Sequence, residues 1–349
     1  VIIVSALTLG SLYGIQGLAL GTVLAMACMA MVQFPALFKT GFRFGFYLDL
    51  KHPGVRKVYL LALPAALGVS VNQVNVFIIG RLASWLPDGS ISALVYADRL
   101  IQSPISLFVL ALGTAIFPLL STRAAQGERE AFSGTLLGAL RVVILSMFPA
   151  SLGLMVLSQP IVSLIFQRGI FKQGSVELTA AALLFYAVGL LGQAAVLLLA
   201  RGFYSLQDTR TPVKISIVTV FINLGLSLVL IRFLQHRGLA LANSLANLAN
   251  MALLMWFMEK KLPGLYGTRF LKFTLSVLVA SGLMAVASYV VSGFLAGQIP
   301  GTVGLVVQVG LAVLAGIIIY LSAVFAFRVD EALFIWRYAG EALRRRTGA

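Results

Sequence analysis

The sequence is poor in charge, histidine and cysteine, and each shortage excludes a class of function. Only 11% of the 349 residues are charged, two are histidines, and Cys28 is the only cysteine. One cysteine cannot build a disulfide framework or a cysteine-rich metal site. His52 and His236 lie far apart in predicted loops, so we do not expect them to bind a metal together. Since the sequence also has no glycine-rich phosphate loop and no nucleophile motif, we do not expect an enzyme.

Apolar residues are abundant. Hydrophobic side chains make up 60% of the sequence and the mean hydropathy is +1.00, values that exclude a water-soluble globular domain. About 20 apolar residues cross a hydrocarbon core of roughly 30 Å. Such runs predict spans at Ile15–Phe38, Val58–Ile79, Ile91–Leu120, Leu136–Leu157, Leu178–Ser205, Ile215–Ile231, Gly238–Met258, Phe270–Leu295 and Val303–Phe327. We therefore predict an all-α polytopic membrane protein with about nine complete transmembrane helices. Val1–Leu9 is apolar but too short to cross, and we interpret it as the second half of an earlier helix.

Lysine and arginine are distributed unevenly between the predicted spans, which predicts the orientation of the chain. Of the 26 basic residues, 19 lie in one alternating set of loops. The opposite set holds only Arg81, Arg168, Lys172, Arg232 and Arg237. Since cytoplasmic loops retain positive charge, the loop from Lys39 to Lys57 and the C-terminus are predicted to be cytoplasmic. Charge beside the membrane then accounts for the net +15, and we expect no nucleic acid as a partner.

Two ionised side chains lie inside a predicted span. Asp98 and Arg99 are adjacent in Ile91–Leu120, which is otherwise apolar enough to cross a bilayer. Each ionised group at such depth costs roughly 2.5 kcal/mol or more unless it pairs or faces water, so intramembrane charges usually mark the pathway of a solute. The pair therefore predicts transport. A structural charge satisfied by a neighbouring helix is the alternative interpretation.

A short repeat points to an internal duplication. Gly-Leu-Ala-Leu occurs at Gly17–Leu20 and at Gly238–Leu241, each time where a turn enters a new span. Six predicted spans separate the copies, and an even number preserves orientation. The pattern predicts two parallel repeats of six helices. Chance is the alternative, because glycine, alanine and leucine are common in spans.

Three motifs carry a resemblance to a known family. Tyr96–Leu100 (Tyr-Ala-Asp-Arg-Leu), followed by Pro104 and Gly113–Pro118, resembles the eighth helix of the MurJ (MviN) family of lipid II flippases. Ala200–Val213 looks like that family's link between its tenth and eleventh helices, and Gln167–Phe171 is similar to a segment ahead of the tenth helix. The resemblance covers the whole chain, from the end of the fifth helix to the fourteenth.

The resemblance implies a MATE-like exporter fold, in which two lobes of six helices enclose a cavity that opens alternately to each side. On that scheme residues 1–39 end the N-terminal lobe, 40–57 form a cytoplasmic linker, 58–258 form the C-terminal six-helix lobe, 259–327 add two transmembrane helices, and 328–349 form a basic cytoplasmic tail.

The resemblance also implies a cargo and a site. The cargo is lipid II, the undecaprenyl-pyrophosphate-linked disaccharide-pentapeptide precursor of peptidoglycan, carried from the cytoplasmic to the outer leaflet of the bacterial inner membrane. In the family an arginine at the position of Arg99 projects into a cationic cavity beside an acid, here Asp98. A guanidinium donates two parallel hydrogen bonds to phosphate oxygens, which agrees with a pyrophosphate ligand.

Two more residues join this predicted site. Gln102 stands where some members of the family have a glutamate, and Arg201 lies about one turn from the end of its span, from where it can also reach the membrane interface. We expect Arg99, Asp98, Arg201 and Gln102 to bind substrate in a monomer whose other partners are membrane lipids.

Polar side chains on three helices predict a weaker cation site. Asn75 lies in Val58–Ile79, Asn223 and Ser227 stand four apart on one face, and Asn243 lies in the following span. Some members of the family are thought to bind sodium among the corresponding helices, so sodium or the membrane potential is the expected energy source and no other cofactor is expected. Neutral oxygens suit a hard cation less well than carboxylates do, and interhelical hydrogen bonding is the alternative.

Two other functions stay open on the sequence alone. An ion-coupled drug or polysaccharide-lipid exporter of the same superfamily would share the twelve-helix core, but we expect it to lack the extra C-terminal helices and the Asp98-Arg99-Leu100 motif. A structural membrane protein that transports nothing would not need an arginine within a span.

Overall fold

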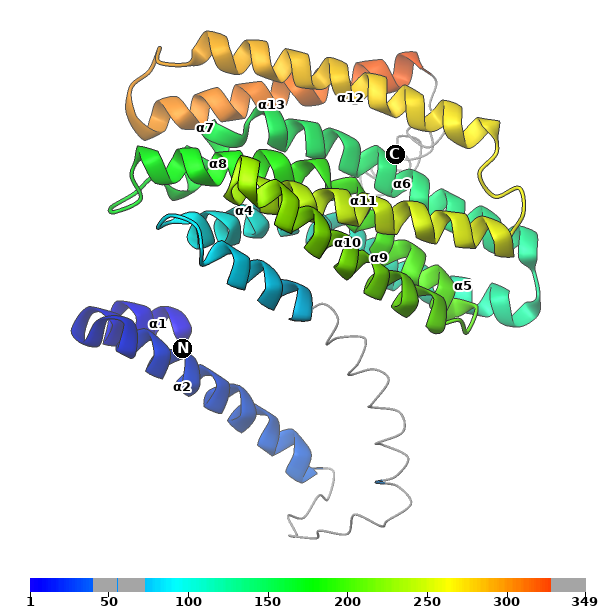
Figure 1. Ribbon diagram of the computed structural model, residues 1–349, viewed down its shortest axis with the longest axis horizontal. Coiled ribbons are helices and arrows are strands. Elements are labelled where there is room, and N and C mark those ends of the chain that lie inside the picture. Colours follow the sequence, from blue (N-terminus) through cyan, green and yellow to red (C-terminus); the bar gives the residue numbers. More distant parts are fainter. Residues whose placement is uncertain (40–54, 56–72, 328–349) are drawn as a thin grey trace, which may run out of the picture. The chain divides into compact units, whose positions relative to one another are not determined.

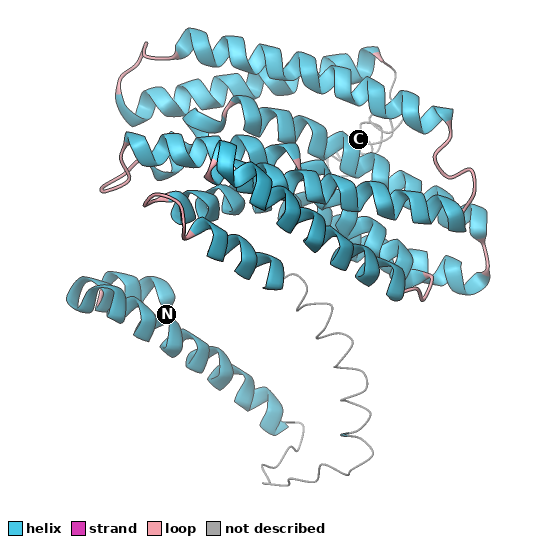
Figure 2. Ribbon diagram, viewed as in Figure 1, coloured by secondary structure: helices cyan, strands magenta, loops and turns pink. Residues whose placement is uncertain are grey.

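The computed structural model describes residues 1–39, 55 and 73–327, and these residues are helical with short connections and no strand (Figures 1 and 2). The chain divides into two compact units, Val1–Pro64 and Ala65–Ala349. The predicted linker 40–57, most of the predicted span Val58–Ile79 and the tail 328–349 lie outside the described residues. The predicted domain boundaries therefore stay predictions.

The first unit is a helical hairpin that turns at a glycine. Helix α1 (Ile2–Leu7) leads into α2 (Leu9–Lys39), which is broken at Gly14, where φ is 57° and ψ is −133°. After the break the chain runs back along itself, since a methyl group on Gly17 would stand 1.9 Å from the Leu9 carbonyl oxygen. Only glycine adopts the backbone conformation found at Gly14 without strain. The break coincides with the predicted start of the Ile15–Phe38 span.

The second unit begins with a short helix, Gln73–Ala83, and a long bent one. Helix α4 (Ser90–Pro104), the π-helix Ile105–Leu110 and α5 (Ala111–Gln126) form one continuous element. The remaining helices are α6 (Arg129–Val156), α7 (Ser158–Phe166), α8 (Gln173–Val188), α9 (Leu190–Ser205), α10 (Arg210–Leu234), α11 (His236–Lys261), α12 (Thr268–Leu295) and α13 (Gly301–Ala326).

Seven of the described helices are long and apolar enough to cross a membrane, or eight if the bent pair α8 and α9 counts as one span. The sequence predicts about nine, and the Val58–Ile79 span falls mostly on residues that the structure does not describe. An all-α polytopic fold is confirmed, and the number of spans stays a prediction.

The predicted single span Leu178–Ser205 is bent by 47° between α8 and α9, at Gly189. Helix α11 packs closely against the bend, since a methyl group on Gly189 would stand 2.5 Å from the Ser244 Cα. The Ser244 hydroxyl donates to the carbonyls of Phe185 at 2.7 Å and Tyr186 at 3.1 Å. A neighbouring hydroxyl thus satisfies the carbonyls at the break, which is how a broken helix is tolerated inside a membrane.

Helices α6, α8, α9 and α11 supply the centre of the second unit, where side chains such as Leu136, Leu183 and Phe203 are fully buried. Helices α12 and α13 pair with each other, and α12 packs on α6 (Figure 1). Tyr320 of α13 donates to the Leu145 carbonyl of α6 at 2.6 Å. In lipid, close packing and such interhelical hydrogen bonds hold helices together, because apolar burial alone gives little.

The two copies of the Gly-Leu-Ala-Leu repeat follow the same turn. Gln235, three residues before Gly238, has φ 52° and ψ −131°, close to the values at Gly14, three residues before Gly17. A methyl group on Gly238 would stand 2.4 Å from the carbonyl oxygen of Leu230, eight residues earlier, just as Gly17 meets Leu9. Shared backbone geometry at both copies favours duplication over chance.

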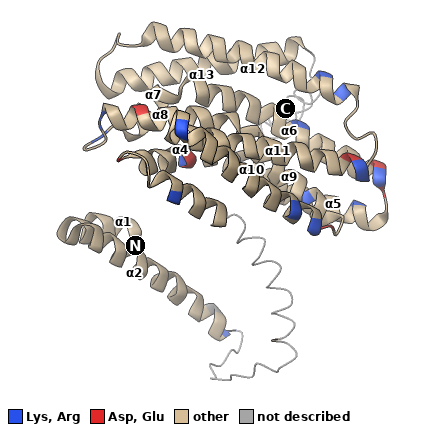
Figure 3. Cartoon of the chain, in the orientation of Figure 1, with Lys and Arg blue, Asp and Glu red and all other residues tan. Residues whose placement is uncertain are grey.

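Basic residues gather at one end of the second unit (Figure 3). This basic end holds the last turns of α5 and α11 and the first turns of α10 and α12, with Arg123, Arg210, Lys260, Lys261 and Arg269. Arg168 and Lys172 lie in the loop between α7 and α8. The clustering agrees with the distribution that predicts a cytoplasmic basic end, and the side of the membrane stays a prediction.

An ion pair joins the connection between α9 and α10 to the last residue of α11 at the basic end. Asp208, between α9 and α10, lies 2.8 Å from the ammonium of Lys261 and accepts hydrogen bonds from the backbone N–H of Thr211 at 3.0 Å and its hydroxyl at 2.6 Å. Burial acts to raise the pKa of Asp208, but the hydrogen bonds from Lys261 and Thr211 outweigh it and hold the pKa at about 2.

This pair predicts how stability depends on pH. Because the pKa of Asp208 is depressed from its ordinary 3.8, the carboxylate stabilises the fold above pH 3.8, and that contribution is lost as the pH falls toward 2. Asp208→Asn is expected to lower the melting temperature in detergent at pH 7 and to weaken its decline between pH 5 and 3. Asp88→Asn, which changes an exposed aspartate, is the control. The same decline in Asp208→Asn as in the wild type would contradict the prediction.

Candidate functional site

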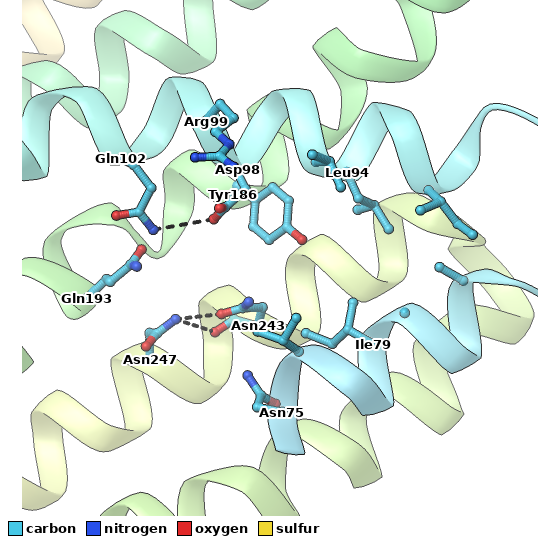
Figure 4. Close-up of a pocket in the computed structure, with 15 residues that line it drawn as sticks. Asn75, Ile79, Leu94, Asp98, Arg99, Gln102, Tyr186, Gln193, Asn243 and Asn247 are labelled. Atoms are coloured by element: carbon cyan, nitrogen blue, oxygen red, sulfur yellow. Dashed lines mark hydrogen bonds between the residues drawn. The ribbon is translucent and has the colours of Figure 1, made fainter. Parts of the chain in front are cut away.

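A cavity of about 390 Å³ opens on one face of α4 in the second unit (Figure 4). Polar residues converge on it from five helices: Asn75, Asp98, Arg99, Gln102, Tyr186, Gln193, Asn243 and Asn247. Apolar residues of α4 and of Gln73–Ala83, among them Leu94 and Ile79, complete the lining. The mixed lining, apolar with a few convergent polar groups, is typical of a site for a small molecule or a headgroup.

Asp98, Arg99 and Gln102, three of the four residues predicted to bind substrate, all line this cavity. The Gln102 amide lies 3.5 Å from the Asp98 carboxylate, one turn away, and donates to it. Adjacent helical side chains point about 100° apart, and within the described part of the chain no ion pair ties Arg99 to a carboxylate. The half-buried Asp98 is thus held by Gln102, whereas the guanidinium of the exposed Arg99 is available to a ligand.

The wall opposite Arg99 consists mainly of amides (Figure 4). Gln193 of α9 faces Gln102, and the Asn247 amide donates to the side-chain oxygen of Asn243 at 2.6 Å and to its carbonyl at 3.0 Å. Neither Tyr186 nor Gln193 is predicted as a site residue from the sequence. A glutamine in the middle of the apolar run Leu178–Ser205 is the signal that could have found Gln193, since uncompensated amides are uncommon in lipid.

Arg201 does not lie with the other predicted substrate residues. Its guanidinium lies against Gly113 of α5, where an added methyl group would stand 1.4 Å from Nη1, and it is not among the residues that line the cavity. That Nη1 is buried and has no hydrogen-bond partner among the described residues. The structure therefore brings Asp98, Arg99 and Gln102 together and places Arg201 elsewhere, between α5 and α9.

The residues of the predicted cation site do meet. Asn223 donates to Asn75 at 2.5 Å, the Ser227 hydroxyl lies 3.4 Å from the Asn223 side-chain oxygen, and Asn243 joins Asn75 and Asn223 around a void of about 30 Å³. All of these ligands would be neutral, and the oxygens of Asn75 and Asn223 already accept hydrogen bonds. The distances support a hydrogen bond between Gln73–Ala83 and α10, and sodium binding stays a prediction.

A double-mutant cycle measures that bond. We expect Asn75→Ala and Asn223→Ala each to lower the melting temperature in detergent, and the double variant to lose less than the sum, with a coupling of about 1–2 kcal/mol. If these residues form an interhelical hydrogen bond and no cation site, raising sodium at constant ionic strength leaves the melting temperature unchanged. A sodium-dependent rise that disappears in Asn223→Ala would contradict the prediction and favour a cation site.

The lining residues suit binding better than covalent chemistry. In the described part of the chain no three His, Cys, Asp or Glu side chains cluster as metal ligands would. Asp98 is the one carboxylate among the described residues that line the cavity, so they offer no second carboxylate for acid–base chemistry. A guanidinium beside several amides instead matches an anionic group with polar substituents.

The sequence model of the family described as lipid II flippase MurJ matches residues 1–311. The chain belongs to this family. It is 40% identical over 238 residues to the probable lipid II flippase MurJ of Vibrio cholerae, covering 68% of this chain and 45% of that protein. It is 34% identical over 241 residues to the lipid II flippase MurJ of Burkholderia cenocepacia, covering 67% and 46%. The chain spans about half the length of the curated relatives it matches.

Solved structures agree on the MurJ fold. A lipid II flippase MurJ in an inward closed conformation aligns with a TM-score of 0.76 and 24% identity, covering 94% of this chain and 65% of that one. A MATE transporter in complex with the ligand MaL6 aligns with a TM-score of 0.50 and 16% identity, covering 80% and 67%. The expected MATE-like fold is confirmed. Membership of the MurJ family also makes an enzyme or a purely structural protein the poorer interpretation.

Proposed function

We propose that this member of the MurJ family translocates lipid II from the cytoplasmic to the outer leaflet of the bacterial inner membrane by alternating access. One observation carries the proposal: Arg99, in the middle of a span, lines a cavity of about 390 Å³ and is not held by an ion pair within the described residues. An arginine kept ionised at that depth needs water or an anionic ligand. The names of the relatives supply the cargo.

In this proposal Arg99 binds the diphosphate of lipid II. Its planar guanidinium donates two parallel hydrogen bonds to phosphate oxygens, and these bonds are stronger in a cavity of low dielectric than in water. Asp98 accepts a hydrogen bond from Gln102 and forms no ion pair with Arg99 among the described residues. The amides of Gln193, Asn243 and Asn247 can donate to and accept from sugar and peptide groups next to the diphosphate.

The size of the cavity limits what it can hold. A volume of about 390 Å³ lies near the lower end of the range of roughly 300–1,000 Å³ for small-molecule sites. It therefore suits the diphosphate and part of a sugar, not a whole disaccharide-pentapeptide. We infer that the remaining headgroup contacts come from parts of the protein outside this cavity, and that the protein acts as a monomer with its C-terminus in the cytoplasm.

The direct test is a translocation assay on the protein produced from its complete reading frame. Proteoliposomes loaded with fluorescent lipid II in both leaflets are treated with a membrane-impermeant quencher, and the protected fraction should fall only when the protein is present. A drug substrate or a lipid-linked polysaccharide precursor is the comparison cargo. Movement of either of these without movement of lipid II would overturn the proposal in favour of another exporter of the same fold.

A further inference from the structure

A second cavity, of about 410 Å³, lies beside the first turns of α4 and shares no lining residue with the cavity that Arg99 lines. It is bounded by the start of α4, the end of α7, the loop Gln167–Lys172 and the first turns of α8. Ser92, Ala93 and Tyr96 of α4 line it, whereas Leu94, Val95 and Asp98 line the Arg99 cavity. At 100° per residue these residues lie on two neighbouring faces of α4, with Arg99 at the edge between them, and the two cavities have no lining residue in common.

Three packed aromatic rings form one wall of the second cavity. Tyr96 lies 4.9 Å from Phe166 and 5.6 Å from Phe171, and the rings of Phe166 and Phe171 are 5.9 Å apart, all between centroids. Such spacings are favourable for aromatic pairs and fix the orientation of each ring. The wall is therefore rigid, and it joins α4, α7 and the loop before α8.

The polar groups of the cavity are one cation and several hydroxyls. Arg168 is the only charged residue among the described residues that line it, and its one direct partner is the Leu164 carbonyl at a weak 3.4 Å. Thr179 is 1% exposed, and its hydroxyl has no hydrogen-bond partner in the described part of the chain. A buried hydroxyl without a partner is destabilising unless something binds it. The Arg168 guanidinium and the Thr179 hydroxyl together indicate an anionic ligand that also has oxygen atoms farther inside the cavity.

The loop over the cavity lies at an end of the helix bundle, where the predicted spans leave the hydrocarbon, so we expect it at the depth of lipid headgroups. It connects α7 and α8 at the end of the bundle away from the basic end, which the charge distribution assigns to the outside (Figures 1 and 3). At its tip Ile170 is 96% exposed and lies between the exposed Arg168 and Lys172. Apolar and basic side chains together with aromatic rings are typical of the layer between hydrocarbon and water.

From these observations we propose that the second cavity binds the headgroup of an anionic glycerophospholipid of the outer leaflet. Arg168 binds the phosphate, the aromatic wall of Tyr96, Phe166 and Phe171 packs against the glycerol and the first acyl carbons, and Thr179 bonds a headgroup hydroxyl or ester oxygen. Ile170 enters the acyl region beside the bound lipid. The site shares no lining residue with the cargo site and goes beyond the proposed transport function.

Charge and depth favour a lipid over other ligands. An arginine at a membrane interface meets a high local concentration of lipid phosphate, and basic pockets between transmembrane helices bind such headgroups. A free sugar would use the hydroxyls of the cavity but would leave Arg168 without an anionic partner and the aromatic wall without an apolar one. A protein partner would need a larger continuous surface than this cavity offers.

Native mass spectrometry with defined lipids tests the proposal. The purified protein is titrated with dioleoyl phosphatidylglycerol and, separately, with dioleoyl phosphatidylcholine. We expect the first phosphatidylglycerol to bind more tightly than phosphatidylcholine, and Arg168→Gln to weaken it about tenfold because a charge-assisted hydrogen bond is lost. Lys172→Gln is the matched control: it removes the same charge from the same loop at a residue that does not line the cavity.

Two further variants separate the cavity from the surface charge. Ser92→Phe, at an exposed position on the cavity lining, should fill the space and lower phosphatidylglycerol binding although Arg168 is present. Thr179→Val removes only the unpartnered hydroxyl, so it should keep or raise the melting temperature while weakening binding. The melting temperature without added lipid reports folding for every variant, and translocation of lipid II is expected to continue in each.

Several outcomes would overturn the proposal. Equal binding of phosphatidylcholine would exclude selection for an anionic headgroup. Unchanged phosphatidylglycerol binding in folded Arg168→Gln and Thr179→Val would exclude this cavity. Displacement of phosphatidylglycerol by inorganic phosphate alone would identify an anion site, and displacement by stoichiometric undecaprenyl diphosphate would identify a site for the carrier lipid. None of these outcomes depends on whether Arg99 binds cargo.

Discussion

Arg99→Ala is expected to reduce lipid II translocation by at least about 100-fold while the protein still accumulates in the membrane. Two charge-assisted hydrogen bonds to a diphosphate contribute about 1.5–3 kcal/mol each, and 1.4 kcal/mol corresponds to a factor of ten. Alanine removes both bonds, and Arg99 is the only cationic side chain among the described residues that line the cavity. The quencher assay on proteoliposomes measures the rate, and immunoblotting of membranes measures the amount of protein.

Two variants control for that result. Arg99→Lys keeps the charge but loses the two-pronged geometry, so its rate should fall between those of the wild type and Arg99→Ala. Arg81→Ala removes an exposed arginine that does not line the cavity, although its neighbour Gly80 does, and it should transport normally. Wild-type translocation by Arg99→Ala at wild-type abundance would remove Arg99 from the cargo site.

Gly238→Ala is expected to destabilise the protein strongly although it adds only one methyl group. The added methyl group would stand 2.4 Å from the Leu230 carbonyl oxygen and 2.6 Å from its carbon, and neither is the movable end of a side chain. The hairpin of α10 and α11 would have to open, at a cost of about 1–3 kcal/mol. Thermal unfolding in detergent, followed by circular dichroism or by loss of the monodisperse peak, measures the effect.

The same change at Gly225 of α10 provides the control. A methyl group on Gly225 would meet no atom within 4 Å, and alanine is the better helix former by about 1 kcal/mol. Gly225→Ala should therefore be neutral or stabilising. Equal melting temperatures for the two variants would show that the hairpin accommodates a side chain at Gly238.

The sequence predicts the helices well where the signal is local. Run lengths of apolar residues place the helix that follows Gly14 and the helices α11, α12 and α13 within three residues of their observed bounds. The predicted starts of α10 and α6 are five and seven residues too late, because each of these helices begins with a polar turn outside the apolar run. The bend at Gly189 was not predicted, because hydropathy across Leu178–Ser205 is continuous. The break depends on a distant residue, Ser244 of α11, whose hydroxyl satisfies the carbonyls that the bend exposes.

In the candidate site, too, the sequence predicts what is local and misses what depends on distant residues. Asp98, Arg99 and Gln102 are predictable as a group because they lie on one helix within four residues. Tyr186 and Gln193 reach the cavity from opposite sides of the Gly189 bend, so their position follows from a break that the sequence does not reveal. Arg201 is an arginine within a predicted span, which made it a candidate site residue. The absence of a side chain at Gly113 lets it pack against α5 instead.

Helix α4 separates two hollows and leads through Pro104 into a π-helix, the kind of irregular turn at which helices bend. A tilt of α4 that enlarges one of these cavities narrows the other. A molecule that binds in one cavity and favours one tilt of α4 then changes the affinity of the other cavity for its own ligand. By thermodynamic reciprocity, the second ligand changes the affinity for the first by the same factor. A lipid that binds in the second cavity and favours one tilt of α4 would therefore be an effector of ligand binding at Arg99.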